Sequence, residues 1–170
     1  MRAGFLAAVL LLAACAGAPP TSPSPTPGEP VRILETGLSA SFEDPFTVAA
    51  ATNQADYEAL WQNFNLRSLR PAVDFGTELV LYFGMAGSSS CPEGFQQLVI
   101  EDDVPRVYAT WQTRPPNQPC TDDLAPQGVL LAVNRAVLPG QPFTLQLRDE
   151  LVCPDCPEHP DRALIDPTEG

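Results

Sequence analysis

Apolar and polar residues alternate along much of the second half of this chain. Every second residue is apolar in two segments, at Val107, Ala109 and Trp111 and again at Phe143, Leu145 and Leu147. A period of two is typical of a strand with one buried face and one solvated face. The chain is therefore expected to form half-buried β-strands at 106–113 and 142–148.

Five further segments have the composition of strands, at 31–36, 46–50, 78–83, 95–101 and 128–134. The residues between the strands at 95–101 and 106–113 read Asp-Asp-Val-Pro, a sequence with turn chemistry. Because only this short turn separates the two strands, residues 95–113 are predicted to form a β-hairpin.

One segment follows a helical period instead. Its apolar residues recur at i, i+3, i+4 and i+7, at Tyr57, Leu60, Trp61 and Phe64. Asn53 is a preferred N-cap residue, and Asp56 places a carboxylate at the positive end of the helix dipole. The sequence predicts a single amphipathic helix at about residues 54–65. The expected fold is α+β, mainly β, with an antiparallel sheet that packs one face against this helix.

The first residues are typical of a targeting signal. Residues 3–14 are almost all apolar, follow Met1 and Arg2, and are about half as long as a membrane-spanning helix. The sequence Leu-Ala-Ala-Cys at 12–15 resembles a bacterial lipobox, whose cysteine is acylated. This resemblance implies a signal peptide at 1–14, lipidation of Cys15, and anchoring to the outer face of a bacterial membrane.

Composition divides the rest of the chain into three parts. Residues 15–30 contain six prolines and few apolar groups, so a disordered, extended linker is predicted after the lipidated cysteine. Residues 31–150 are long enough for one globular domain. Residues 151–170 form a tail rich in cysteine, proline and acidic residues.

The charge of the chain excludes one class of partner. The chain has 21 acidic and 9 basic residues and a net charge of −12. Such a charge repels the phosphate backbone of nucleic acids. Nucleic acid is therefore not an expected partner.

Four cysteines remain once Cys15 is assigned to the anchor: Cys91, Cys120, Cys153 and Cys156. An even number of cysteines in an exported protein predicts disulfides. Four cysteines permit three pairings, and the sequence favours Cys91 with Cys120 together with the closely spaced pair Cys153 and Cys156. The first of these bridges would join the loop at 88–91 to the loop at 119–123.

Cys153, Cys156 and His159 offer two thiolates and an imidazole at spacings that a zinc ion can use. A complete structural zinc site needs a fourth ligand. A thioredoxin-like redox motif lies in a βαβ pattern at a helix N-terminus, and neither feature surrounds these two cysteines. A local structural disulfide is therefore favoured, and no cofactor is expected. A metal-binding or thiol-redox module that uses these three residues is the alternative function.

The hydroxyl-rich sequence at 88–90 lacks the pattern of a hydrolase. Ser88, Ser89 and Ser90 do not form a Gly-x-Ser-x-Gly elbow, and His159, the only imidazole, lies in the tail. The paired acids at 102–103 and 122–123 lack the alternating ligands of a calcium loop and are typical of solvated turns. We therefore predict that the chain is not an enzyme.

The order of these features resembles a known family. The residues that carry the resemblance are Tyr57, Leu60 and Trp61 in the helix, followed by Val73, Asp74 and Phe75, which open a strand. A Gly-rich loop and a hairpin come next. Over about residues 50–148 the chain is similar to the PrcB-type domain of bacterial envelope lipoproteins, named after a non-catalytic subunit that supports a surface protease. Where that family carries a Thr-Gly-Gly-Tyr loop, this chain has Ser-Ser-Ser-Cys-Pro-Glu-Gly-Phe at 88–95.

A second resemblance concerns the cysteines. Segments 87–92 and 120–123 are similar to a pattern in bacterial lipoproteins, which supports pairing Cys91 with Cys120. The predicted function is a non-catalytic binding or assembly-support domain of the cell envelope that acts on another exported protein. Its predicted working surface is the stapled loops, because loops on a rigid scaffold commonly carry recognition. The candidate binding residues are Ser88, Ser89, Ser90, Asp122 and Asp123.

Overall fold

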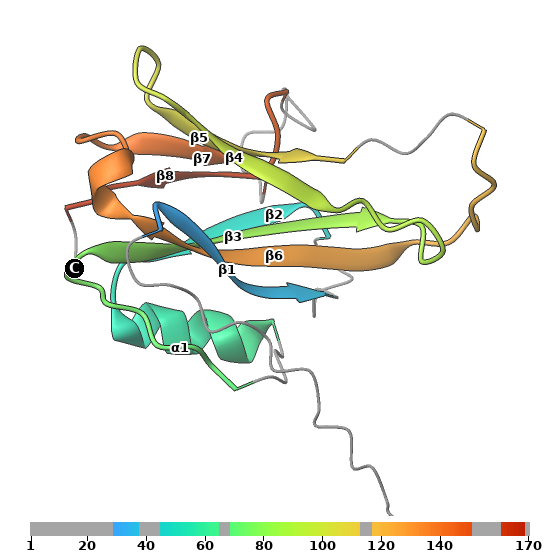
Figure 1. Ribbon diagram of the computed structural model, residues 1–170, viewed down its shortest axis with the longest axis horizontal. Coiled ribbons are helices and arrows are strands. Elements are labelled where there is room, and N and C mark those ends of the chain that lie inside the picture. The colour runs from blue at the N-terminus through green and yellow to red at the C-terminus, as the bar shows by residue number, and fades with distance from the viewer. Residues whose placement is uncertain (1–28, 38–44, 65–68, 113–116, 151–160, 169–170) are drawn as a thin grey trace, which may run out of the picture.

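Two four-stranded sheets and one helix form three layers (Figure 1). The computed structural model describes residues 29–37, 45–64, 69–112, 117–150 and 161–168. The first sheet has the order β1 (Val31–Gly37), β6 (Ala125–Asn134), β3 (Glu78–Gly87) and β2 (Thr47–Ala51). The second has the order β4 (Phe95–Glu101), β5 (Arg106–Trp111), β7 (Phe143–Gln146) and β8 (Arg162–Ile165). A 3₁₀ turn, Arg135–Val137, follows β6.

The main core lies between the two sheets. On β3 and β6 every second side chain points into this space, and on the second sheet Val107, Ala109, Phe143 and Leu145 face them. Phe83 lies at the centre of the first sheet, in register with Val48 on β2 and Val129 on β6, and is fully buried. The alternation at 107–109 and 143–147 therefore predicted the buried residues of β5 and of the β7 segment.

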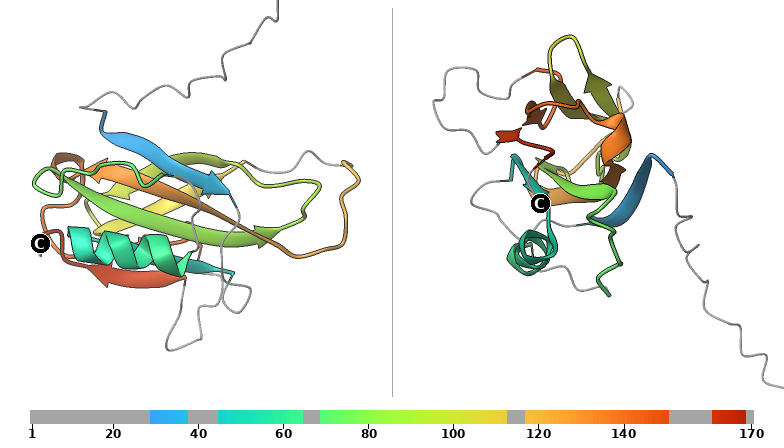
Figure 2. Two further views of the ribbon diagram at one scale, coloured as in Figure 1. Left: turned by 90° about the horizontal axis from the view of Figure 1, so that it is seen from below. Right: turned by 90° about the vertical axis from the view of Figure 1, so that its left-hand side faces the viewer.

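The helix α1 (Gln54–Asn63) packs on the outer face of the first sheet, as the end view in Figure 2 shows. Asn53 is its N-cap, because the Asn53 side chain accepts a hydrogen bond from the Asp56 amide at 3.0 Å. Tyr57, Leu60 and Trp61 are buried against the sheet. The predicted helix and its cap are thus confirmed.

Tyr82 of β3 fills the space between this helix and the sheet. Its ring stacks on Phe64 with 3.7 Å between ring centroids. A Cβ atom added to Gly128 would lie 2.7 Å from the Tyr82 hydroxyl, and one added to Gly84 would lie 2.8 Å from it. Glycine at these two positions lets the tyrosine lie flat on the sheet, so the helix can approach closely.

The mainly β fold with one helix and the hairpin of β4 and β5 are confirmed. Three features differ from the sequence prediction. The strands divide into two sheets, β5 and β7 pair in parallel, and residues 162–165 of the predicted tail form β8 beside β7. Within the described residues, no helix is long and apolar enough to cross a membrane.

Each sheet has two edge strands, β1 and β2 in the first sheet and β4 and β8 in the second. Arg32 fixes β1 to the neighbouring elements, because it forms a two-pronged ion pair with Glu78 at 2.8 and 2.9 Å and donates to the Ala72 carbonyl. The register of β1 shifts between Ile33 and Glu35, where the strand bulges. The edge strands β1 and β4 border the same side of the sandwich, which is where the candidate site lies.

Candidate functional site

A disulfide joins the two connections that pass between the sheets at one end of the sandwich. Cys91 lies between β3 and β4, and Cys120 lies between β5 and β6. Their Cα atoms are 5.7 Å apart. The predicted pairing of Cys91 with Cys120 is confirmed, and we call residues 88–91 and 120–123 the loop pair.

Hydrogen bonds between hydroxyl groups connect the loop pair around Thr121. The Thr121 hydroxyl lies 2.9 Å from the Ser88 hydroxyl and 3.0 Å from that of Ser90, and the Thr121 amide donates to Ser90 at 2.8 Å. The Ser89 amide donates to the Asp123 carboxylate at 3.2 Å, and the Thr121 hydroxyl bonds the same carboxylate. Ser88, Ser89, Ser90 and Asp123 are therefore brought together as the sequence predicted.

Asp122 takes no part in this network and is exposed. Hydrogen bonds from Ser89 and Thr121 lower the pKa of Asp123 from 3.8 to about 2, because they stabilise its ionised form. Asp123 therefore stays ionised at neutral pH and acts as an acceptor that organises the loop pair.

The stability of the domain is expected to depend on Asp123 between about pH 4 and pH 2. A carboxylate whose pKa is lowered by folding stabilises the folded state above its unfolded pKa, and this contribution disappears as the pH falls through the folded value. Wild type should exceed Asp123→Asn in stability at pH 6, and the difference should vanish near pH 2. Urea unfolding at several pH values measures this difference.

Asp122→Asn is the matched control for this experiment, because it removes the same charge from the same loop without removing a hydrogen bond of the network. A constant difference between wild type and Asp123→Asn from pH 6 to pH 2 would contradict the role given to this carboxylate. So would an equal pH-dependent loss in the Asp122→Asn variant.

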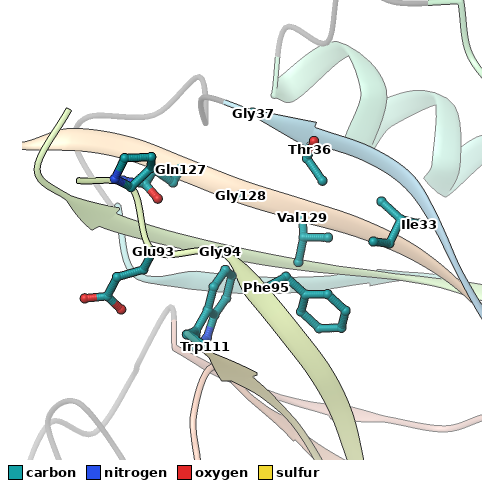
Figure 3. Close-up of a pocket in the computed structure, with 11 residues that line it drawn as sticks. Ile33, Thr36, Gly37, Glu93, Gly94, Phe95, Trp111, Gln127, Gly128 and Val129 are labelled. Carbon is teal, nitrogen blue, oxygen red and sulfur yellow. The ribbon is translucent and has the colours of Figure 1, made fainter. Parts of the chain in front are cut away.

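A cavity of about 400 Å³ lies directly behind the loop pair, between the two sheets. Figure 3 shows the side chains of Ile33, Thr36, Val129, Phe95 and Trp111 around one common space. The remaining lining residues come from the segment before β4 and from β1 and β6: Pro92, Glu93, Gly94, Gly37, Gln127 and Gly128.

The loop pair positions both walls of this cavity. Pro92 directly follows Cys91 and begins the wall on the side of the second sheet, whereas Gln127 lies four residues after Asp123 on the side of the first sheet. The disulfide therefore ties together the two chain segments that lead into opposite walls. A cross-link at this position limits how far the sheets can separate at the cavity.

Aromatic rings form the wall on the side of the second sheet. Phe95 and Trp111 pack edge to face, with 6.2 Å between ring centroids and 83° between ring planes. The Trp111 Nε1 donates to the Leu147 carbonyl at 3.3 Å. Because its polar atom already has a partner, Trp111 contributes apolar ring surface to the cavity.

The other predicted chemical residues lie outside the described residues. These are the lipidated Cys15, the signal peptide, and Cys153, Cys156 and His159 of the tail. In the part of the chain that the structure describes, no group of three or more His, Cys, Asp and Glu side chains could hold a metal ion. The pairing of Cys153 with Cys156 and the lipidation of Cys15 stay predictions.

The cavity was not found by sequence reasoning. Gln127, one of its polar lining residues, precedes the predicted strand at 128–134, so the sequence pattern gives it no place on a strand face. Phe95 and Trp111 each lie in a predicted strand, and their apolar character indicates core packing as readily as a ligand site. One feature of the sequence does point to this aromatic wall. Phe95 begins the first strand of the predicted hairpin and Trp111 lies near the end of the second, so the hairpin places the two rings opposite each other.

Comparisons with known proteins add no assignment. No family model, no curated protein and no solved structure matches the chain.

Proposed function

We propose that this chain is a lipid-anchored protein of the bacterial envelope whose domain recognises another exported protein without catalysing a reaction. The observation that carries the proposal is the loop pair, which holds exposed hydroxyl and carboxylate groups in a fixed arrangement. A pre-organised polar surface loses little conformational entropy on binding and therefore suits recognition.

The disulfide supports the proposed location. Cross-links of this kind form and persist in exported proteins, whereas the cytosol keeps thiols reduced. A signal peptide at 1–14, followed directly by Cys15, is consistent with the same compartment. Anchoring through Cys15 would then keep the domain at the membrane surface.

The state of Asp123 supports a non-catalytic role for the loop pair. A general base needs a pKa near the working pH, and hydrogen bonds lower the pKa of this carboxylate to about 2. The neighbouring serine hydroxyls bond to Thr121 and to each other. Their geometry fixes the shape of a surface, which is what an assembly-support domain of the PrcB type would need.

Photo-crosslinking in living cells tests the proposed surface. A photoreactive residue at Asp122 should give crosslinks to an exported protein, because Asp122 is an exposed member of the loop pair. The same residue at Asp102, an exposed acidic position in the β4–β5 turn, is the matched control and should give none of these products.

Identical products from both positions, or none from Asp122 in a correctly folded chain, would contradict the proposal. A second variant series strengthens the assignment. Alanine at Ser88 and Ser90 should weaken the crosslink from Asp122, because it removes the hydroxyl groups that fix Thr121.

A further inference from the structure

The sandwich is closed along one side and open along the other. On the closed side the edge strand β2 contacts β7 and β8 of the second sheet. On the other side the cavity lies between the edge strands β1 and β4, and several of its lining residues reach the surface. Thr36, Gly37 and Pro92 are exposed, and Ile33 is 52% exposed. Among the described residues, the cavity therefore opens to the surface between these two strands.

The shape of the two edge strands suits a side chain better than an added strand. The register of β1 shifts between Ile33 and Glu35, and that of β4 shifts between Phe95 and Gln97, so both strands are irregular beside the cavity. Such irregularity disturbs the regular backbone groups with which a further strand would pair. Phe95, Trp111 and Ile33 instead present apolar surface to the cavity. This surface is stabilised when a large apolar side chain covers it.

The loop pair places uncompensated negative charge next to the cavity. Asp122 and Asp123 are exposed, and no ion pair among the described residues reaches either carboxylate. The one ionisable residue that lines the cavity, Glu93, already has a counter-charge, because its carboxylate is 3.5 Å from the Arg148 guanidinium. Pro92 lines the cavity and directly follows the loop pair, so the two surfaces are continuous. An occupant therefore meets an apolar cavity beside two carboxylates that lack a counter-charge.

We propose that the cavity holds a large aromatic or branched side chain from a basic segment of the exported partner protein. A lysine or arginine of the same segment pairs with the carboxylates of the loop pair. This inference rests on the proposed function and names the chemistry of its partner. A few apolar side chains that fill pockets typically dominate the binding energy of a protein interface, and a volume of about 400 Å³ accommodates one such side chain.

The charge of the chain argues for a basic partner rather than a second copy of itself. Each copy has a net charge of −12, so two copies repel each other. A basic segment is attracted instead, and complementary charge both speeds association and excludes acidic competitors.

The crosslink from Asp122 in living cells supplies the first test. Mass spectrometry of the crosslinked product should identify a segment in which a lysine or arginine lies close to an aromatic or branched residue. Thr36→Trp places an indole at the mouth of the cavity and should reduce the crosslink about tenfold. Leu164→Trp adds the same side chain at a 76% exposed position of β8 and should leave the yield within about twofold.

A synthetic peptide of the crosslinked segment tests the contacts from the partner's side, where no substitution can unfold the domain. Its Kd is measured by fluorescence anisotropy with the chain from residue 15 carrying Cys15→Ser, which needs no detergent. Alanine in place of the apolar side chain of the peptide should weaken binding about tenfold or more. Glutamine in place of its lysine or arginine should weaken binding about twofold to fivefold.

A double-mutant cycle assigns the charge contact to the loop pair. Asp122→Asn should weaken binding of the basic peptide about twofold to fivefold and should not change binding of the glutamine peptide. Asp102→Asn removes an exposed carboxylate from the β4–β5 turn and is the matched control, which should leave both Kd values unchanged.

The outcomes separate this inference from the proposed function. If Asp122 gives no crosslink in a correctly folded chain, the proposed function fails and this inference fails with it. A crosslink that is equally strong in the Thr36→Trp and Leu164→Trp variants overturns the cavity contact alone. A segment without a basic residue, a peptide whose affinity survives loss of its apolar side chain, or a product that joins two copies of this chain would also overturn the inference.

Discussion

Replacing Cys91 and Cys120 together by serine is expected to lower the free energy of unfolding by about 3.6 kcal/mol. The bridge spans a sequence separation of 29 residues, and closing a loop of this size removes entropy chiefly from the unfolded chain. The loss is a large fraction of the 5–15 kcal/mol that is typical of a domain. The free energy of unfolding of the variant should also fall more steeply with urea concentration, because the unfolded chain exposes more surface without the cross-link.

The experiment is cleanest in a chain that already carries Cys153→Ser and Cys156→Ser, so that only one pair of cysteines is under test. In that background, a reductant should lower the stability of the chain that keeps Cys91 and Cys120 to that of the chain with serine at both positions. The reductant should not change the stability of the chain with serine at both positions. A loss below about 1 kcal/mol would mean that the unfolded chain already keeps the two loops close.

The second large effect is expected for Phe83→Ala, which should lower the free energy of unfolding by about 3–5 kcal/mol. The Phe83 ring is fully buried between the sheets, and removing it leaves a void that the flanking Val48 and Val129 cannot fill. Phe83→Leu keeps part of the volume and should cost about 1.5 kcal/mol or less. Chemical unfolding of both variants measures the difference.

Leu164→Ala is the matched control for the core prediction, because Leu164 is a large apolar residue on the 76% exposed position of β8. This substitution should change the free energy of unfolding by no more than about 0.5 kcal/mol. Similar losses from Phe83→Ala and Leu164→Ala would contradict the division of apolar residues between a core and an exposed surface.

The sequence predicted the features that local patterns determine. Asn53 caps the helix because its side chain and the Asp56 amide are close in sequence, and the β4–β5 hairpin forms across a short turn. The pairing of Cys91 with Cys120 could also be predicted, since few alternatives existed once the anchor cysteine was set aside.

Long-range pairing determined the features that the sequence did not predict. The β8 strand, Arg162–Ile165, has no clear alternation of its own and becomes a strand by pairing with β7. β6 begins at Ala125, before the predicted start, because it continues to pair with β3 through Pro126 and Gln127. Gln127 therefore belongs to a strand that faces the cavity, which no local pattern around it indicates.

The direction of β1 has a mechanical consequence. Its Val31 end, where the chain arrives from the predicted linker, pairs with Val133, and its Gly37 end pairs with Gly128, nearer the loop pair. A force between a tether at the first end and a partner held at the loop pair would run along the strand. The hydrogen bonds between β1 and β6 would then bear the load together in shear, which resists rupture better than peeling them apart one at a time.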